Sequence, residues 1–396
     1  MSSSKISKKI LITAGETSGD MNAATLIDVL LEKGPFEIFA VGGPETSRRP
    51  VKMLYDSRDW AAIGYIEAIK KVPRLLVVLK KLTDFMAENK PDLLLLIDYP
   101  GFNMRLARRA KKLGIPTLFY FPPSRFAVNP EDVRDAAENL SCVAANFTFT
   151  YKVYKEAGAN VSFVGHPLLD LARPGMPIED IYKTLQLDPN RPIVGLCPGS
   201  RKSELDFLLP IMLKAAEMLL KKFPDLQFLV PVVKTETPDV YGIPKSDLVK
   251  QLNESKLPVK LIEGRIYDVM AISKLLLISS GTATLEASRV GTPMIIVYKV
   301  SLYTEVLAKI FNKLPTFIGL PNIILGRQAV PELIQHDFTP EKLFAQASEL
   351  LSSPEKLQKQ KSDLLEVISH LGSPGAHNRV AELAMSLMKC DDASRI

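Results

Sequence analysis

The stretch KKILITAGETSGDMNAATLIDVLLEK, residues 8–33, joins a strand pattern directly to a helix pattern. Residues 8–14 predict a strand whose last five residues, ILITA, are mostly apolar, and residues 21–33 repeat apolar side chains at helical spacing. The alternation continues with apolar runs at 36–43, 91–101 and 115–121 and helical patterns at 66–90 and 103–114. Apolar strands that alternate with helices are typical of a parallel sheet covered on both faces. The sequence therefore predicts a doubly wound α/β domain.

The same alternation restarts after GHPLLDLARPGMPIED, residues 165–180, which is rich in proline and glycine. It predicts strands at 191–197, 225–233, 259–264, 275–281 and 293–299, with helices at 204–223, 269–274 and 284–291. We expect two Rossmann-like domains, residues 1–170 and 171–355, that face each other across a cleft. A helical segment at 356–396 is expected to pack back on the first domain or on a partner subunit. Ligands of such sheets bind at the carboxyl ends of the strands.

The composition limits the class of protein. The chain has 396 residues, of which 46% are apolar and 24% charged, so it can bury two cores. A net charge of +6 is compatible with an anionic membrane surface or substrate and does not indicate nucleic acid. Cys142, Cys197 and Cys390 lie far apart, which fits neither a metal site nor a disulfide framework. With no apolar run of about 18 residues, we expect a cytoplasmic protein that at most rests on a membrane.

Residues 14–20, AGETSGD, connect the first strand to the first helix. Small residues let a ligand approach the backbone, and a helix N-terminus attracts anions. The stretch matches neither nucleotide fingerprint, GxGxxG or GxxxxGK[ST], and Glu16 and Asp20 would repel a phosphate. Two interpretations stay open, a polar ligand site and a plain helix entry capped by Ser18 or Asp20.

Asp98, in LLIDYPGFN, directly follows five apolar residues and so lies at the mouth of a buried strand. A carboxylate fixed in that position suits a general base. The alternative is a cap for the helix predicted at 103–114.

Two segments of the second half offer groups suited to a nucleoside diphosphate. CPGSR, residues 197–201, ends in Arg201, which can bind phosphate oxygens or pair locally with Glu204. SSGTATLEASRVGTP, residues 279–293, opens a helix that carries Glu286 one turn in, where a carboxylate can accept ribose hydroxyls. A plain capped helix is the alternative for the second segment.

LPNIILGRQAVPEL, residues 320–333, predicts a loop that holds Asn322 and Arg327 without an obvious core role. Polar residues in irregular loops often serve function. His166 lies at the predicted hinge, and taken alone it is more typical of a structural histidine.

Residues 63–82 form a basic amphipathic element. It could rest on an anionic membrane or receive acyl chains. The alternative is a core helix with a solvated basic face. The apolar side chains proposed for membrane or acyl contact are Ile66, Ile69, Val72, Leu75 and Leu76.

Seven segments taken together resemble the lipid-A-disaccharide synthase family, inverting glycosyltransferases of the GT-B fold. In chain order they are AGETSGD, IGYIEAI, LLLLIDYPGFN, FVGHPLLD, CPGSRKSELDFLLP, SSGTATLEASRVGTPMIIVYKVS and LPNIILGRQAVPELIQ. The resemblance runs along nearly the whole chain.

The resemblance implies a reaction that joins UDP-2,3-diacylglucosamine to 2,3-diacylglucosamine 1-phosphate and releases UDP. It implies Asp98 as the base, with Glu16 and Asp20 as the other carboxylates to consider, and neither metal nor cofactor. Its partners are these two lipids and the cytoplasmic face of the inner membrane, with a homodimer as one assembly. The implied UDP contacts are Ser200, Arg201, Ser280, Gly281, Thr282, Glu286 and Asn322. The implied sugar or acceptor cleft holds Gly15, Ser18, Gly19, Asn103, His166 and Arg327.

One region departs from the family pattern. Where the family shows Ser-Pro, then Trp-Ala-Trp and a basic helix, this chain reads PPSRFAV at 122–128 and then NPEDVRDAAE. A later Pro-Phe-Glu loop reads FTFT at 147–150. A different acceptor and an inactive UDP-sugar-binding paralogue therefore stay open. A UDP-sugar 2-epimerase also stays open, because it shares the two-domain fold. The element at 63–82 argues against the epimerase, and Asp98 with Arg201 argues against the inactive paralogue.

Overall fold

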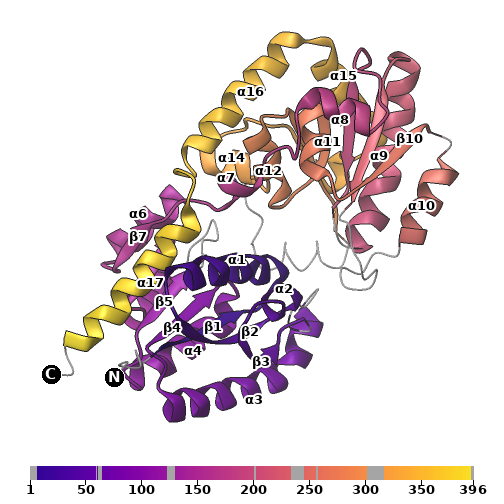
Figure 1. Ribbon diagram of the computed structural model, residues 1–396. Coiled ribbons are helices and arrows are strands. Elements are labelled where there is room, and N and C mark those ends of the chain that lie inside the picture. Colours follow the sequence, from indigo (N-terminus) through magenta and orange to yellow (C-terminus); the bar gives the residue numbers. More distant parts are fainter. Residues whose placement is uncertain are drawn as a thin grey trace. The chain divides into compact units, whose positions relative to one another are not determined.

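The computed structural model describes residues 7–58, 60, 65–122, 130–199, 202–232, 245–255, 257–300 and 316–393. The chain divides into two compact units (Figure 1). The first comprises Met1–Pro167 together with Leu371–Ile396, and the second is Leu168–His370. The chain passes from the first unit to the second after Pro167, three residues before the predicted boundary at 170. It returns to the first unit after His370, within the segment 356–396 that was predicted as one piece.

The first unit contains a seven-stranded parallel sheet in the order β3-β2-β1-β4-β5-β6-β7. The strand order reverses between β1 and β4, where Ala14 lies opposite Ile97. The carboxyl ends of these two central strands are therefore neighbours, which is where open α/β sheets bind ligands. The strands are β1 Lys8–Ala14, β2 Phe36–Gly42, β3 Lys52–Asp56, β4 Leu93–Ile97, β5 Thr117–Tyr120, β6 Cys142–Ala145 and β7 Val161–Phe163.

Helices cover both faces of this sheet. On one face α3, Tyr65–Asn89, and α4, Pro100–Lys112, pack with α5, Pro130–Asn139, and α6, Thr148–Glu156. On the other face α1, Thr17–Lys33, lies beside the C-terminal helix α17, Ala376–Ala393 (Figure 1). A short helix α2, Pro44–Ser47, follows β2. Helix α1 begins four residues before the pattern at 21–33, with Glu16 as its N-cap residue and no side-chain cap. The predicted caps Ser18 and Asp20 are therefore wrong for this helix.

The second unit contains a six-stranded parallel sheet in the order β10-β9-β8-β11-β12-β13. Its order reverses between β8 and β11, so their carboxyl ends are also neighbours. The strands are β8 Ile193–Cys197, β9 Gln227–Val232, β10 Val259–Glu263, β11 Leu275–Ser279, β12 Met294–Tyr298 and β13 Glu332–Ile334.

The helices of the second unit also form two layers. Helices α9, Lys202–Lys222, and α15, Pro340–Ser352, pack on one face. Helices α11, Ile266–Ile272, α12, Ala283–Val290, and α16, Pro354–Ser369, pack on the other. The remaining helices are α7 Leu168–Leu171, α8 Ile178–Thr184, α10 Lys245–Glu254, α14 Leu320–Leu325 and the 3₁₀ turn η1 Gln335–Asp337.

The loop predicted at 320–333 is wrong. Residues 320–325 form helix α14, and residues 332–334 form strand β13. Pro321 lies in the first turn of α14, where proline is tolerated, and Gly326 ends the helix with a φ of 65°. These proline and glycine residues punctuate a helix rather than mark an irregular loop.

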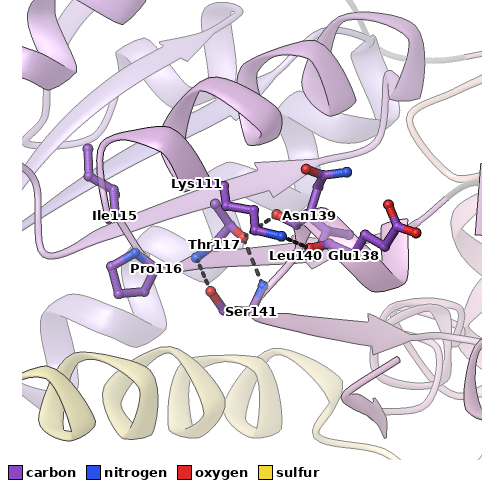
Figure 2. Close-up of a pocket in the computed structure, with 9 residues that line it drawn as sticks. Lys111, Ile115, Pro116, Thr117, Glu138, Asn139, Leu140 and Ser141 are labelled. Atoms are coloured by element: carbon purple, nitrogen blue, oxygen red, sulfur yellow. Dashed lines mark hydrogen bonds between the residues drawn. The ribbon is translucent and has the colours of Figure 1, made fainter. Parts of the chain in front are cut away.

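A cavity of about 290 Å³ lies at the amino-terminal edge of the first sheet (Figure 2). The backbone N–H groups of Thr117 and Ser141 each donate to the hydroxyl of the other residue, over 3.0 and 2.9 Å. Lys111 donates to the carbonyl of Glu138. These polar groups hold the ends of α4, β5 and β6 together, on the sheet edge opposite to the one where ligands bind.

Among the helices that the structure describes, none is both long and apolar enough to cross a bilayer.

Candidate active site

Among the described residues, two groups of predicted site residues lie at the carboxyl edges of the sheets, one group in each unit. The first lies where β1 and β4 end, and the second lies where β8 and β11 end. Within the described ranges, no three His, Cys, Asp or Glu side chains gather as a bound metal ion would require.

Asp98 occupies a strained turn directly after β4. Asp98 and Tyr99 have φ angles of 54° and 48°, in the left-handed region. Holding a residue other than glycine there costs on the order of 1–3 kcal/mol. The Oδ1 atom of Asp98 accepts from the N–H of Tyr99 over 2.8 Å, and its Oδ2 atom accepts from the hydroxyl of Ser18 over 3.4 Å. Helix α4 begins at Pro100 with Tyr99 as its N-cap residue, so the alternative of Asp98 as the cap is wrong.

The environment of Asp98 raises the pKa of its carboxyl above the ordinary value. Burial is the largest cause, and the hydrogen bonds from Tyr99 and Ser18 offset it in part. A carboxylate with a raised pKa is a stronger base, because it holds a proton more tightly. The turn therefore presents a group that can take a proton.

Asn103 lies beneath this turn. It is 1% exposed, and its Nδ2 atom donates to the carbonyl oxygens of Asp98 and Ile97, over 2.7 and 3.2 Å. Its Oδ1 atom accepts from the hydroxyl of Thr13, on β1, over 2.8 Å. The structure thus gives Asn103 backbone partners rather than a place on the surface of a cleft.

Gly15 follows β1 and allows Tyr99 to approach the backbone closely. A Cβ atom at residue 15 would lie 2.4 Å from Cγ of Tyr99, so no larger residue fits. Tyr99 also donates from its hydroxyl to the carbonyl of Trp60 over 3.3 Å. Gly19 lies close to the same turn, since a Cβ atom there would be 3.6 Å from Cβ of Asp98. Residues 15–19 and 98–99 therefore form one cluster.

The two other acidic residues of AGETSGD have different surroundings. Glu16 is exposed at the start of α1. The pKa of Tyr99 is raised first by the burial of its own side chain and second by the negative charge of Glu16. Asp20 is buried, and its carboxylate accepts from the N–H groups of Gly43, Glu45 and Thr46 over 2.8, 2.9 and 3.0 Å. These three bonds satisfy the N-terminus of α2, which favours a structural role for Asp20.

His166 lies within the core of the first unit. Its ring centroid is 5.5 Å from that of Phe121 and 5.2 Å from that of Phe147. Burial, and then the nearby His377, lowers the pKa of His166 to about 3. The imidazole is therefore neutral at physiological pH, and its surroundings are aromatic.

The loop after β8 is described only in part, because Ser200 and Arg201 lie outside the described residues. Gly199 has a φ of 109°, and a Cβ atom there would lie 2.0 Å from Oε2 of Glu204. The glycine thus allows Glu204 to pack against the turn.

The segment after β11 opens helix α12. Ser280 donates from its hydroxyl to the carbonyl of Ile318 over 2.8 Å, and Thr284 donates to the carbonyl of Gly281 over 2.7 Å. Gly281 and Thr282 are exposed, and a Cβ atom at Gly281 would meet nothing within 4 Å. Thr282 is the N-cap residue of α12 and makes no side-chain cap. The start of α12 therefore lies open at the carboxyl edge of the sheet, as an anion site requires.

Glu286 lies one turn into α12 and is held by Tyr267. The Tyr267 hydroxyl, on α11, donates to Oε1 of Glu286 over 3.1 Å. Burial raises the pKa of Glu286, and this hydrogen bond offsets the effect in part. Tyr267 was not among the predicted site residues, although it follows β10 at the same sheet edge, and that position was a usable signal.

Asn322 and Arg327 have intramolecular partners. Asn322 is buried and donates to the carbonyl of Val330 and to Oε1 of Glu332, each over 2.7 Å. Its Oδ1 atom accepts from the N–H groups of Ala329 and Val330. Arg327 pairs with Asp363 and Glu366 of α16. The described contacts favour a structural role for both residues in fastening α14.

The described part of α3 has an exposed apolar surface. Leu76 is 45% exposed and Val77 is 56% exposed, and Val72 is exposed beside them. Leu75 packs partly against the core of the first unit. The side chains of Ile66 and Ile69 lie outside the described residues.

Comparison with known sequences gives consistent matches. The model of the lipid-A-disaccharide synthetase family matches residues 10–386. The lipid-A-disaccharide synthase of Geobacter sulfurreducens is 36% identical over 383 residues, which cover 96% of this chain and 98% of that protein. The synthase of Trichlorobacter lovleyi is 38% identical with the same coverage.

Comparison with solved structures concerns the fold. A putative UDP-N-acetylglucosamine 2-epimerase from Listeria monocytogenes is similar with a TM-score of 0.60 and 14% identity, covering 94% of this chain and 95% of that one. MurG of Acinetobacter baumannii is similar with a TM-score of 0.59 and 15% identity, covering 96% and 99%. Together with the two parallel sheets, these likenesses confirm the predicted α/β class of the GT-B type.

Proposed function

The chain belongs to the lipid-A-disaccharide synthase family, a family of glycosyltransferases, and from this premise we propose its substrates and the roles of its residues. The donor is UDP-2,3-diacylglucosamine and the acceptor is 2,3-diacylglucosamine 1-phosphate. The products are the lipid A disaccharide 1-phosphate and UDP. The strained, partly buried carboxylate of Asp98 at the β1/β4 switch point carries the proposal.

Asp98 acts as the general base. The acceptor hydroxyl attacks the anomeric carbon of the donor, and its proton passes to the Asp98 carboxylate as the new C–O bond forms. The bond from the anomeric carbon to the diphosphate breaks at the same time, and the electron pair leaves with UDP. A single displacement of this kind inverts the anomeric centre. Ser18, which donates to the same carboxylate, holds its Oδ2 atom in place.

The start of α12 binds the diphosphate, and Arg201 assists it. The N-terminus of a helix stabilises the negative charge that develops on UDP as it leaves. Glu286 accepts hydrogen bonds from the ribose hydroxyls, and Tyr267 orients its carboxylate. The support for this assignment is the exposed start of α12 and the single turn that separates it from Glu286.

The protein acts at the cytoplasmic face of the inner membrane, where its lipid substrates would lie. Val72, Leu76 and Val77 of α3 enter the interface, and basic residues of the same helix attract anionic lipids. The homodimer stays a prediction, which the molar mass from light scattering in solution tests.

The direct test is the reaction itself. The protein is incubated with UDP-2,3-diacylglucosamine and 2,3-diacylglucosamine 1-phosphate, and mass spectrometry follows the disaccharide product and UDP. We expect both products to form together. UDP release without a disaccharide, or conversion of the donor to an isomer, would contradict the transferase proposal. If a disaccharide formed only with another acylated acceptor, the assignment of the acceptor would be wrong and the transferase proposal would stand.

The matched variant is Asp98→Asn, which keeps the size of the side chain and removes the base. Turnover should fall by a factor of roughly 10² to 10⁴. UDP affinity should stay unchanged in calorimetry, because the diphosphate site lies on α12. The melting temperature at neutral pH should not fall, because burial raises the pKa of Asp98 and an amide avoids the cost of a buried charge. Near-normal turnover in this variant would remove Asp98 as the base.

A further inference from the structure

We propose that Asn103 and Thr13 are positioning residues, which hold the Asp98–Tyr99 turn in its left-handed conformation and so fix the Asp98 carboxylate in place. This inference rests on the proposed role of Asp98 as the base. Neither residue reaches the carboxylate itself in the hydrogen bonds described above, so their effect passes through the backbone.

The first support is that the backbone N–H and carbonyl groups at the turn are hydrogen-bonded. The N–H of Asp98 donates to the carbonyl of Tyr120, on β5, over 3.1 Å. The carbonyls of Ile97 and Asp98 both accept from the amide nitrogen of Asn103. The peptide units on either side of the strained residue are thus fastened at both ends. Buried carbonyls that lose their donor carry a desolvation penalty, so the amide of Asn103 opposes relaxation of the turn.

The second support is the way in which Thr13 orients Asn103. Thr13 is fully buried on β1, opposite Leu96 of β4, and it is polar within an otherwise apolar run. Its hydroxyl donates to Oδ1 of Asn103, which leaves the Nδ2 group to face the two carbonyls. Three elements, β1, β4 and α4, therefore meet at this one amide.

The third support is the placement of the carboxylate that results. The same turn lays the Tyr99 ring against Gly15 and leaves Oδ2 of Asp98 3.4 Å from the Ser18 hydroxyl. Two successive left-handed residues other than glycine tend to relax when their restraints are removed. Relaxation would move the carboxylate away from Ser18 and towards water. Its pKa, which burial raises, would then fall towards the ordinary value for aspartate.

The experiment compares the pH dependence of kcat in Asn103→Leu with that of the unaltered protein. We expect kcat to fall roughly tenfold to hundredfold, the loss typical of a misplaced catalytic group. We also expect the acidic limb of the profile to move to lower pH, while the KM for the UDP-sugar stays within about twofold, because uniform donor binding is untouched. A residue that only stabilised the fold would not move the acidic limb.

A pair of variants at Thr13 and one control variant at Asn146 keep the result interpretable. Thr13→Val removes the hydroxyl at nearly constant volume, and it should move the acidic limb of the kcat profile to lower pH, as Asn103→Leu does. Thr13→Ser keeps the hydroxyl, so its acidic limb should lie where it does in the unaltered protein. Asn146→Leu removes an equally buried amide that bonds the backbone of Phe121 and Gly165, and it should lower the melting temperature without moving the limb. If Asn103→Leu does not fold, the Thr13 pair decides.

A double variant separates this inference from the proposed function. In the Asp98→Asn background, Asn103→Leu should cause little further loss, because it acts through a base that is already absent. If the double variant lost kcat by the product of the two single-variant factors, the positioning role would be overturned. An unchanged limb in both Asn103→Leu and Thr13→Val, with Asp98→Asn inactive, would overturn it and leave Asp98 as the base. An active Asp98→Asn enzyme would overturn both.

Discussion

His166 is a buried base that must stay neutral for the first unit to be stable. The pKa of His166 is about 3 in the folded protein, because burial and His377 disfavour the imidazolium. An unfolded chain gives histidine a pKa of about 6.5. A group whose pKa is depressed by folding contributes stability that is complete above the unfolded pKa and is lost as the pH falls towards the folded value. Acid therefore favours the unfolded state between about pH 6.5 and pH 3, by up to about 1.4 kcal/mol per pH unit.

Replacement of this imidazole by a ring that does not titrate should weaken the acid sensitivity. We expect His166→Phe, which suits a site between Phe121 and Phe147, to lose less stability between pH 7 and pH 5 than the unaltered protein. Denaturant unfolding at the two pH values measures the difference. An equal loss in both proteins would show that His166 is not a source of the acid sensitivity.

For polar residues, the sequence predicted the position in the chain better than the hydrogen-bond partners. Asp98 was placed correctly after five apolar residues, because an apolar run fixes the end of a buried strand. Asn103, Asn322 and Arg327 were expected at ligand sites, and the described contacts pair them with backbone or acidic groups. In the sequence, a polar residue of a glycine-containing segment looks the same whether it binds a ligand or bonds to its own chain. Its partners come from other elements, which only the folded chain brings together.

Helix α3 combines a buried face with an exposed apolar surface. Val78 and Leu79 belong to the core of the first unit, while Leu76 and Val77 are exposed. Arg74, Lys80 and Lys81 are exposed on the same helix. The buried face fits the core-helix interpretation of residues 63–82, and the exposed face is the one proposed for the membrane.

A matched pair of substitutions separates these two faces. Leu76→Ser with Val77→Ser should reduce sedimentation with anionic vesicles by roughly tenfold or more, since each apolar side chain is worth about 1.5–3 kcal/mol when fully buried. High salt should release the unaltered protein by screening its basic residues. Leu79→Ser is the control, and it should lower the melting temperature instead. Unchanged sedimentation of the double variant would contradict the membrane surface on α3.

The predicted elements agree best where the apolar runs are long. Strand β1 has the predicted bounds, 8–14, and β4 lies within 91–101. No strand was predicted at β3, Lys52–Asp56, or β7, Val161–Phe163, the two edge strands of the first sheet. The buried strand β6, Cys142–Ala145, was not predicted either, and it has only four residues. Edge strands are short and only half buried, so they lack the apolar signal that marks a central strand.

The C-terminal helix α17 returns to the first unit after the chain has completed the second. Val380, Ala381, Ala384 and Met388 are buried in the core that α1 also covers. Arg379 donates from Nε to the carbonyl of Val164 over 2.8 Å, which ties the helix to the segment where the chain leaves the unit. The segment 356–396 was predicted to pack back on the first domain or on a partner subunit. Its division at His370 depends on contacts with residues between 10 and 164 and could not be predicted locally.

Two lysine substitutions on α17 test this packing. Ala384→Lys buries an ammonium group in the core and should cost several kcal/mol of unfolding free energy. Ser386→Lys, on the exposed side of the same helix, should change it by less than about 0.5 kcal/mol. Thermal unfolding compares the two variants with the unaltered protein. Equal stability of the two would show that α17 is not needed by the first unit.

The place of α17 in the chain also sets an order of events during synthesis. A nascent chain folds as it emerges, with N-terminal domains usually first. Here the N-terminal sheet is made early, but the helix that covers Ile10, Ile12 and Leu93 emerges only after residues 168–370. The second unit can therefore complete its core before the first, although it is translated later. During that interval one apolar face of the N-terminal sheet lacks the cover of α17, and a ribosome that stalls within the second unit exposes that face to chaperones or to aggregation.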